Sequence, residues 1–111
     1  MNCLNSVLIE GTCMSKPMTE ARPGKETAVC SFTIQSMRKD AEGLDASLFE
    51  IEAHGNLSGR IEQTINQGRG LRIVGRMKQI RWLDDSGQER SKVRIIAEHV
   101  EFKPIGGPYE V

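Results

Sequence analysis

The chain has 111 residues, of which 38% are hydrophobic and 27% charged, and its 15 basic and 15 acidic residues cancel to a formal net charge of zero. This length fits one domain of ordinary size, and the composition excludes a disordered chain. No apolar run approaches the roughly 18 residues of a membrane span, and residues 1–10 do not resemble a secretion signal, so we expect a cytoplasmic protein without membrane contact. Zero net charge argues against a generic polyanion binder identified by its overall charge, although a neutral protein can still present a local basic groove.

The first half of the chain predicts three strands separated by two loops. In each strand apolar and polar residues alternate, and Gly11 in the first marks a bend or a close backbone approach. The segment 15–26 contains two prolines and a glycine, and the segment 37–46 is charged, so both are predicted to be loops. The three predicted strands are 6–13, 28–36 and 47–54.

In the third predicted strand Phe49 alternates with Glu50 and Glu52. The alternation assigns Phe49 to an apolar row, and thus to the core, together with Phe32 and Phe102 of other strands. The two glutamates are predicted to lie on a solvated outer face.

A short helix is predicted after the third strand, because three apolar residues recur every four positions: Leu57, Ile61 and Ile65. Asn56 or Ser58 is expected to cap its start and Gly68 to close its end.

The last third of the chain predicts a β-hairpin. Residues 70–82 alternate throughout, residues 91–102 return, and the sequence DDSG at 84–87 is a strong turn signal because glycine can adopt a positive φ. In the returning strand two residues are predicted to face inward, Val93 and Ile95, and two outward, Lys92 and Arg94.

The predicted order is three strands, one helix and two strands. Closure of five strands into a barrel removes exposed edges, and this order is that of the OB-fold. We therefore predict an all-β, five-stranded OB-fold barrel over residues 1–103 with one helix between strands three and four. Residues 104–111, rich in proline and glycine, are predicted to be a short flexible C-terminal segment.

Three cysteines, Cys3, Cys13 and Cys30, form neither an even set nor a CxxC pair, so no disulfide framework is expected. Together with His54 and His99 they could meet in space, but their spacing matches no zinc site. We predict buried or half-buried cysteines, and neither a metal nor a cofactor.

No nucleophile motif, metal motif or phosphate-binding loop occurs in the chain. The glycines at 68 and 70 lie between a helix and a strand, which is the wrong order for a dinucleotide site. We therefore predict a protein without enzymatic activity.

Basic residues concentrate between residues 69 and 94, where only Asp84, Asp85 and Glu89 oppose them, in or beside the predicted turn. This distribution predicts a locally positive surface on a neutral protein. A solvated outer face is the alternative interpretation. The basic residues predicted to contact nucleic acid are Arg72, Arg76, Lys78, Arg81, Arg90, Lys92 and Arg94.

Trp82 shares a row with several of these cations, since residues two apart in a strand point the same way. Cations follow a phosphate backbone, and stacking on an exposed indole is worth about 1–3 kcal/mol per base. Duplex DNA hides the base faces, so the pattern favours single strands. The alternative is that Trp82 merely covers the hairpin.

Four segments in the right order resemble bacterial single-stranded DNA-binding proteins, the SSB family, over residues 5–102. The segment at 5–11, NSVLIEG, is similar to the family's N-x-V-x-L-x-G strand, and VCSFTI at 29–34 follows it. FEIEAHG at 49–55 is similar to the strand that usually ends in aromatic-Gly-Lys. GRMKQIRWLDDSGQER at 75–90 is similar to the hairpin G-x-L-x-x-R-x-W-x-D-x-x-G-x-x-R.

The resemblance implies a homotetramer of OB-folds that wraps single-stranded DNA in replication, recombination and repair, with replication or repair proteins as further partners. It implies that Trp82 and Phe49 stack on bases, which overrides the core assignment of Phe49. His54 falls where the family usually has phenylalanine, so its stacking role is weaker.

Three departures limit the resemblance. The segment 37–46 lacks an aromatic residue that the family often has, and Asn56 replaces a common lysine. The chain ends at residues 108–111 without the long tail and acidic, partner-docking tip of the family. We therefore expect a tailless variant, a phage or plasmid relative, or a truncated form, and we do not carry over docking through that tip.

Two other interpretations remain. The chain could be a primosome-type OB-fold adaptor that acts mainly through protein contacts, which a dimer with a stable protein partner would indicate. It could also be an RNA-binding OB module, although such modules usually have more surface aromatics on adjacent strands.

Overall fold

The computed structural model of the chain describes residues 1–21 and 28–103. The predicted flexible segment 104–111 and part of the first predicted loop, including Pro23 and Gly24, lie outside the described residues. The elements in chain order are β1 (Val7–Cys13), β2 (Met18–Glu20), β3 (Val29–Asp40), β4 (Gly43–His54), α1 (Asn56–Thr64), β5 (Gly70–Leu83) and β6 (Glu89–Phe102).

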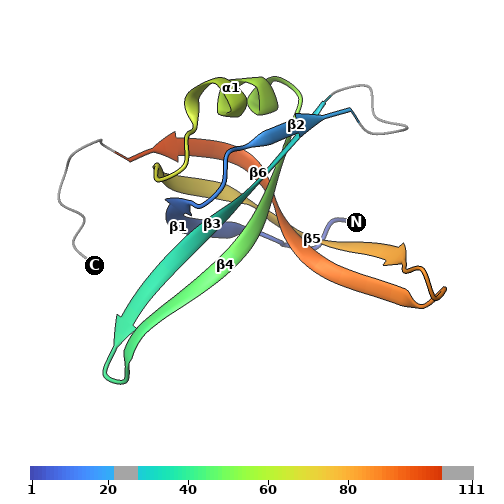
Figure 1. Cartoon of the computed structure of the whole chain (residues 1–111), viewed down its shortest axis with the longest axis horizontal. Coiled ribbons are helices and arrows are strands. Elements are labelled where there is room, and N and C mark those ends of the chain that lie inside the picture. The colour runs from blue at the N-terminus through green and yellow to red at the C-terminus, as the bar shows by residue number, and fades with distance from the viewer. Residues whose placement is uncertain (22–27, 104–111) are drawn as a thin grey trace.

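The five long strands close into a barrel, in the spatial order β1-β5-β6-β4-β3, and β3 returns to pair with β1. All of these pairs are antiparallel except β4 with β6, which is parallel. The helix α1 follows β4 in the chain and lies beside the barrel at the top of Figure 1. This closed five-stranded sheet confirms the predicted OB-fold arrangement.

The core lies inside the barrel and beneath α1. Phe32 is 4% exposed, which confirms its core assignment, and Phe102 is half-buried against the same cluster. Ile61 and Ile65 are buried, as the helical spacing predicted. The largest apolar side chains with no more than 1% exposure are Ile34, Ile51, Ile61, Ile65, Leu71 and Ile73.

Gly11 marks a close approach of two backbones, which is one of the two alternatives that the sequence left open. A Cβ at this position would lie 2.7 Å from the carbonyl oxygen of Gln35 on β3. The approach occurs where β1 passes from β5 to β3, because Thr12 pairs with both Gly70 and Gln35.

The segment 37–46, predicted to be an exposed loop, is instead the outer half of a long hairpin. β3 and β4 remain paired out to Asp40 and Gly43, and Gly43 has a φ of 131°. This arm projects from the barrel towards the lower left of Figure 1. Its charged composition gave no strand signal because both faces of the arm are exposed, so no apolar row is required.

A short strand also forms within the first predicted loop. β2 pairs with the start of β3, with Met18 opposite Ser31 and Glu20 opposite Val29. Three residues are too few for an alternation pattern. The segment is a strand only because it pairs with β3, and the sequence pattern could not predict that pairing.

The helix caps differ from the predicted ones. The N-cap is Gly55, with a φ of 64° and no side-chain cap, while the hydroxyl of Ser58 donates to the carbonyl of Gly55 at 2.7 Å. The helix ends at Thr64, before Gly68, whose N–H instead donates to the carbonyl of Cys13 at 2.7 Å. The helix therefore ends before Gly68, and the backbone N–H of Gly68 is bonded to β1 rather than closing the helix.

β6 contains a bulge that the sequence pattern did not reveal. Val74 lies opposite His99 whereas Gly75 lies opposite Ala97, so Glu98 is one extra residue in β6. Val93, predicted to face the core, is 57% exposed, although Ile95 is buried as predicted. The outer part of the β5–β6 hairpin projects beyond the barrel on the right of Figure 1, so its inner face has no core to cover.

No helix in the described part of the chain has both the length and the apolar character needed to cross a membrane.

Candidate nucleic-acid interface

Three neighbouring strands present one shared surface beside the β5–β6 turn. In paired strands, residues directly opposite each other point to the same side, and residues two apart along a strand do so too. Lys78 lies opposite Arg94 and Trp82 opposite Arg90, while β4 continues the surface on the other side of β6. We call this surface the Trp82 face; it carries Glu50, Glu52, Arg76, Lys78, Ile80, Trp82, Arg90, Lys92 and Arg94.

Trp82 is 43% exposed near the tip of β5. The ammonium of Lys92 lies 5.7 Å from the centroid of the indole ring, within the range of a cation–π contact. Because the hairpin projects beyond the barrel, the indole is only partly covered. The predicted combination of indole and cations on one face is thus present in the structure.

Arg76 and Lys78 are exposed on the Trp82 face, and neither forms an ion pair with another described residue. Their charge is therefore open to an external anion. Both lie on β5 between the barrel and Trp82, so an extended chain that touched the indole could continue along them.

Two carboxylates from β4 neutralise cations on this face, which the sequence analysis did not anticipate. Glu50 Oε2 is 2.9 Å from Lys92 Nζ and 2.9 Å from Arg94 Nε. Glu52 was predicted to be solvated but is 1% exposed, with its Oε1 3.3 Å from Arg94 Nη1. The parallel pairing of β4 with β6 brings the glutamates to the basic residues across a sequence separation that no local pattern reveals.

The pairing with Lys92 and Arg94 holds the pKa of Glu50 below its usual value, with the Lys92 hydrogen bond as the largest cause. Glu50 therefore remains ionised at neutral pH and keeps its two partners neutralised.

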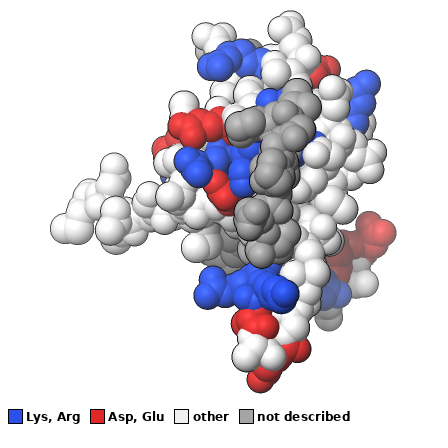
Figure 2. All heavy atoms as spheres, turned by 90° about the vertical axis from the view of Figure 1, so that its left-hand side faces the viewer, with Lys and Arg blue, Asp and Glu red and all other residues white. Residues whose placement is uncertain are grey.

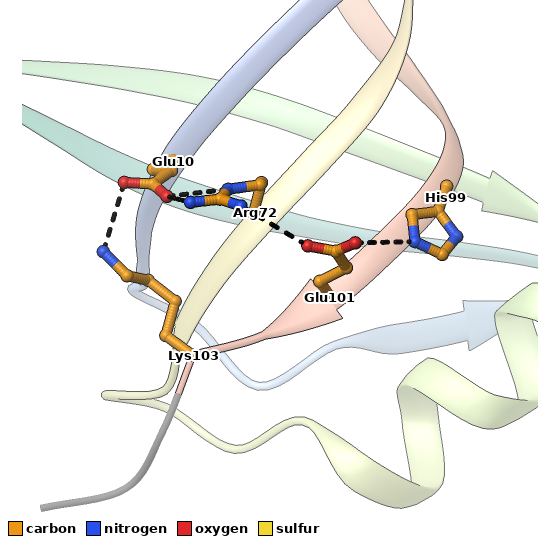
Figure 3. Close-up of polar contacts among 5 residues, drawn as sticks. All are labelled: Glu10, Arg72, His99, Glu101 and Lys103. Carbon is orange, nitrogen blue, oxygen red and sulfur yellow. Dashed lines mark hydrogen bonds and ion pairs between the residues drawn. The ribbon is translucent and has the colours of Figure 1, made fainter. Parts of the chain in front are cut away.

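Arg72 follows the same alternation along β5 as Trp82, as predicted, but it belongs to a separate site at the other end of the strand. It lies ten positions from Trp82, about 33 Å at full extension. Its Nη2 lies 2.6 Å from Glu10 on β1, and its Nη1 lies 3.6 Å from Glu101 on β6 (Figure 3). The same network continues to His99 and Lys103, so the structure does not bring Arg72 to the Trp82 face.

Arg81 and Arg90 lie at the end of the hairpin. Arg81 alternates with Trp82 and so projects from the opposite side of β5, where its Nη2 donates to Gln79 at 2.7 Å. Arg90 is on the Trp82 face, but its Nε lies 2.9 Å from Asp84. The Asp84 carboxylate also accepts the turn N–H groups of Ser86 and Gln88, and Arg90 is the largest cause of its lowered pKa.

Phe49 is 37% exposed, so it does not belong to the core to which the alternation assigned it. Its position opposite Ile34 nevertheless places it on the opposite side of β4 from Glu50. Its exposure arises because it lies where the β3–β4 arm leaves the barrel. Leu48, 63% exposed, is the apolar residue that shares the side of Glu50, and the same alternation could have identified it.

His54 ends β4, and its Nε2 lies 3.4 Å from Glu52 Oε2. Its ring is 29% exposed, so less of it is open to a base than of Trp82.

Figure 2 shows the left-hand side of Figure 1, away from the β5–β6 turn, and on that side Lys and Arg lie beside Asp and Glu in separate groups rather than in one continuous basic stripe. On the Trp82 face, the ion pairs of Arg90, Lys92 and Arg94 leave less open positive charge than the count of basic residues suggested.

Metal-ligating side chains do not gather in groups of three or more within residues 1–21 and 28–103. Cys13 and Cys30 are buried and Cys3 is exposed, so the prediction of buried or half-buried cysteines was wrong for Cys3 alone. Burial raises the pKa of the Cys13 and Cys30 thiols, which keeps them protonated and inert at neutral pH.

The free energy of unfolding should decrease as the pH falls from about 5 towards 2.5. Paired cations lower the pKa values of Glu10, Glu50 and Asp84 in the folded protein, so each contributes stability above its ordinary pKa and loses it on protonation. Urea unfolding at several pH values measures this decrease. It should be shallower for Glu10→Gln, which removes one of the three groups; parallel curves for the two proteins would contradict the assignment.

Comparison with known proteins agrees with the family resemblance found in the sequence. The model of a family described as "Single-strand binding protein family" matches residues 4–103. A protein of Treponema pallidum (strain Nichols) named single-stranded DNA-binding protein is 32% identical over 79 residues, which cover 68% of this chain and 44% of that protein. A protein of Aquifex aeolicus (strain VF5) with the same name is 31% identical over 104 residues, which cover 89% of this chain and 69% of that protein.

Among solved structures, the one titled "Plasmodium falciparum SSB complex with ssDNA" superposes with a TM-score of 0.81 and covers 94% of this chain and 98% of that chain. The sequence identity is 17%, so this likeness concerns the fold.

Proposed function

This chain belongs to the single-strand binding protein family, and on that premise we propose that it binds single-stranded DNA with little dependence on base sequence. Bases stack on Trp82, while Arg76 and Lys78 contact the phosphate backbone. Stacking on one face of a base accepts every base, and backbone contacts carry no sequence information.

One observation carries the proposal beyond family membership: a partly exposed indole lies on the same face as two cations that have no ion pair with another described residue. A tryptophan that only covered the hairpin would not need open cations beside it. The exposed side chains Phe49 and Leu48 offer further apolar contact where the β3–β4 arm leaves the barrel. His54 has a lesser role.

The remaining basic residues contribute less directly. Lys92 and Arg94 face the strand but are paired with glutamates, and Arg90 holds the turn through Asp84. Arg72 and Arg81 lie away from the indole, so they would contact DNA only if the strand continued around the protein.

The biological role proposed is protection of single strands during replication, recombination and repair in the cytoplasm, by binding and without catalysis. The assembly proposed is a homotetramer, in which four stacking sites on one strand multiply affinity. Contacts with replication or repair proteins belong to the same proposal.

Tryptophan emission should be quenched when the protein is titrated with oligo-dT, because Trp82 is the only tryptophan in the chain. Affinity should fall with added salt, since each phosphate contact releases counterions with a slope of about −0.7 on logarithmic axes. Light scattering on the same samples gives the stoichiometry. Saturable binding without quenching would exclude Trp82 as a stacking site, and the absence of binding in low salt would exclude the function.

A further inference from the structure

Glu50 lies in the middle of the Trp82 face, at a position where three contacts converge on one carboxylate. Its Oε2 accepts from Lys92 Nζ and Arg94 Nε, both at 2.9 Å, and its Oε1 is 3.2 Å from Lys92 Nζ. A phosphate group offers the same chemistry, because its oxygens accept charge-assisted hydrogen bonds from Lys and Arg. The carboxylate thus has the ligands that a nucleic-acid phosphate would need.

The position of Glu50 relative to the indole strengthens this comparison. Lys92 contacts Glu50 on one side and lies 5.7 Å from the Trp82 ring on the other. A base stacked on the indole would bring its own phosphate near Lys92, so carboxylate and phosphate would compete for the same ammonium group.

The surface around Glu50 is open enough to admit a competitor. An open depression of about 340 Å³ is lined by Glu50 and Arg94 together with Lys16, Ser31 and Thr33. The side chain of Glu50 is 45% exposed and that of Lys92 38%, so solvent and anions reach the pair.

Glu52 differs from Glu50 in this respect. Its side chain is only 2% exposed, and it holds Arg94 and His54 from within the protein. Of the two glutamates, Glu50 alone is therefore placed for exchange with an external ligand, while Glu52 keeps Arg94 in position.

We infer that Glu50 is an internal competitor of the nucleic acid: its carboxylate occupies a phosphate position on the Trp82 face and withholds Lys92 and Arg94 from the bound strand. This inference rests on the proposed single-strand binding. It makes Glu50 a determinant of affinity and of salt sensitivity.

Glu50→Gln should bind oligo-dT more tightly than the unchanged protein, with a steeper salt dependence. The release of Lys92 adds about 0.7 to the logarithmic salt slope, and the release of Arg94, which Glu52 still holds, would bring the sum to at most about 1.4. The affinity advantage should therefore grow about threefold to sevenfold when salt is lowered from about 200 mM to about 50 mM. Anisotropy of labelled oligo-dT measures both quantities, and circular dichroism confirms that each variant is folded.

The chain offers a matched control in Glu10→Gln. Glu10 also holds two cations, Arg72 at 2.6 Å and Lys103 at 3.2 Å, but on the distant network of Figure 3. This substitution changes the net charge equally and should alter the salt slope much less. Equal effects of the two variants would show a general charge effect and overturn the inference.

A second variant tests the mechanism through Lys92. As a single substitution, Lys92→Gln should change the salt slope little, because Glu50 already pairs with the Lys92 ammonium. In the Glu50→Gln background the same substitution should lower the slope by about 0.7. Equal effects in both backgrounds would overturn the competition.

The outcomes separate this inference from the function on which it rests. If the unchanged protein binds and Glu50→Gln gives the same affinity and slope, the competition is wrong but the function stands. If neither protein binds oligo-dT in low salt, both fail. If only Glu50→Gln binds, the competition is supported in its strongest form.

Discussion

Gly75→Ala should unfold the barrel or bring it close to unfolding. A Cβ at this position would lie 2.1 Å from the carbonyl oxygen of Ile96 and 3.2 Å from Cα of Ala97, both backbone atoms of β6. Neither atom can rotate away, because β5 and β6 are paired on both sides of this point. We expect a loss of about 3 kcal/mol or more in the free energy of unfolding, a large share of the stability of a small domain.

Urea unfolding followed by circular dichroism measures this loss, and Gly59→Ala is its control. A Cβ at Gly59, inside α1, meets nothing within 4 Å. Alanine there should stabilise the protein by up to about 1 kcal/mol, since alanine is the better helix former. A Gly75→Ala protein within about 1 kcal/mol of the unchanged one would show that β6 can shift at its bulge.

Trp82→Ala should weaken the binding of oligo-dT by about fivefold to 150-fold per stacked base, which is the range that corresponds to 1–3 kcal/mol of stacking. The fold should survive, because the side chain is 43% exposed and lies outside the core. The loss should persist at high salt, because stacking does not depend on released counterions. Since the variant has no tryptophan, anisotropy of a labelled oligonucleotide replaces intrinsic fluorescence as the measurement.

Two variants bracket this result. Trp82→Phe keeps an aromatic face and should recover much of the affinity. Leu83→Ala removes the next residue in the chain, which is 70% exposed but lies on the other side of β5, and should leave affinity nearly unchanged. Binding by Trp82→Ala within about twofold of the unchanged protein would remove the indole from the site.

The charge pattern fits the single-strand binding that we propose for this neutral chain. Most cations near the indole are held by carboxylates, and Arg76 and Lys78 remain open. Such a surface gives weaker long-range attraction than the number of basic residues implies, so stacking carries a larger share of the affinity. The Trp82 variants measure the contribution of stacking to affinity, and the Glu50 variants measure the contribution of the cations.

The sequence alone determined the order of the five long strands along the chain, the helix between the third and fourth of them and the turn at Gly87, and it limited Gly11 to a bend or a close backbone approach. These depend on local rules: alternation of side chains, helical spacing and the freedom of glycine. The placement of Trp82 and Lys78 on one side of β5 follows from alternation too, because the bulge lies in β6 and leaves the count along β5 intact.

Tertiary structure alone decided which of these residues remain available to a ligand. Glu50 and Glu52 reach the basic residues of β6 only because β4 pairs with it in parallel, across more than forty positions in the chain. The exposure of Phe49 and Val93 depends on how far each hairpin extends beyond the barrel, which side-chain alternation does not encode. Trp82 and its neighbouring cations were thus evident in the sequence, but the carboxylate that faces them was not.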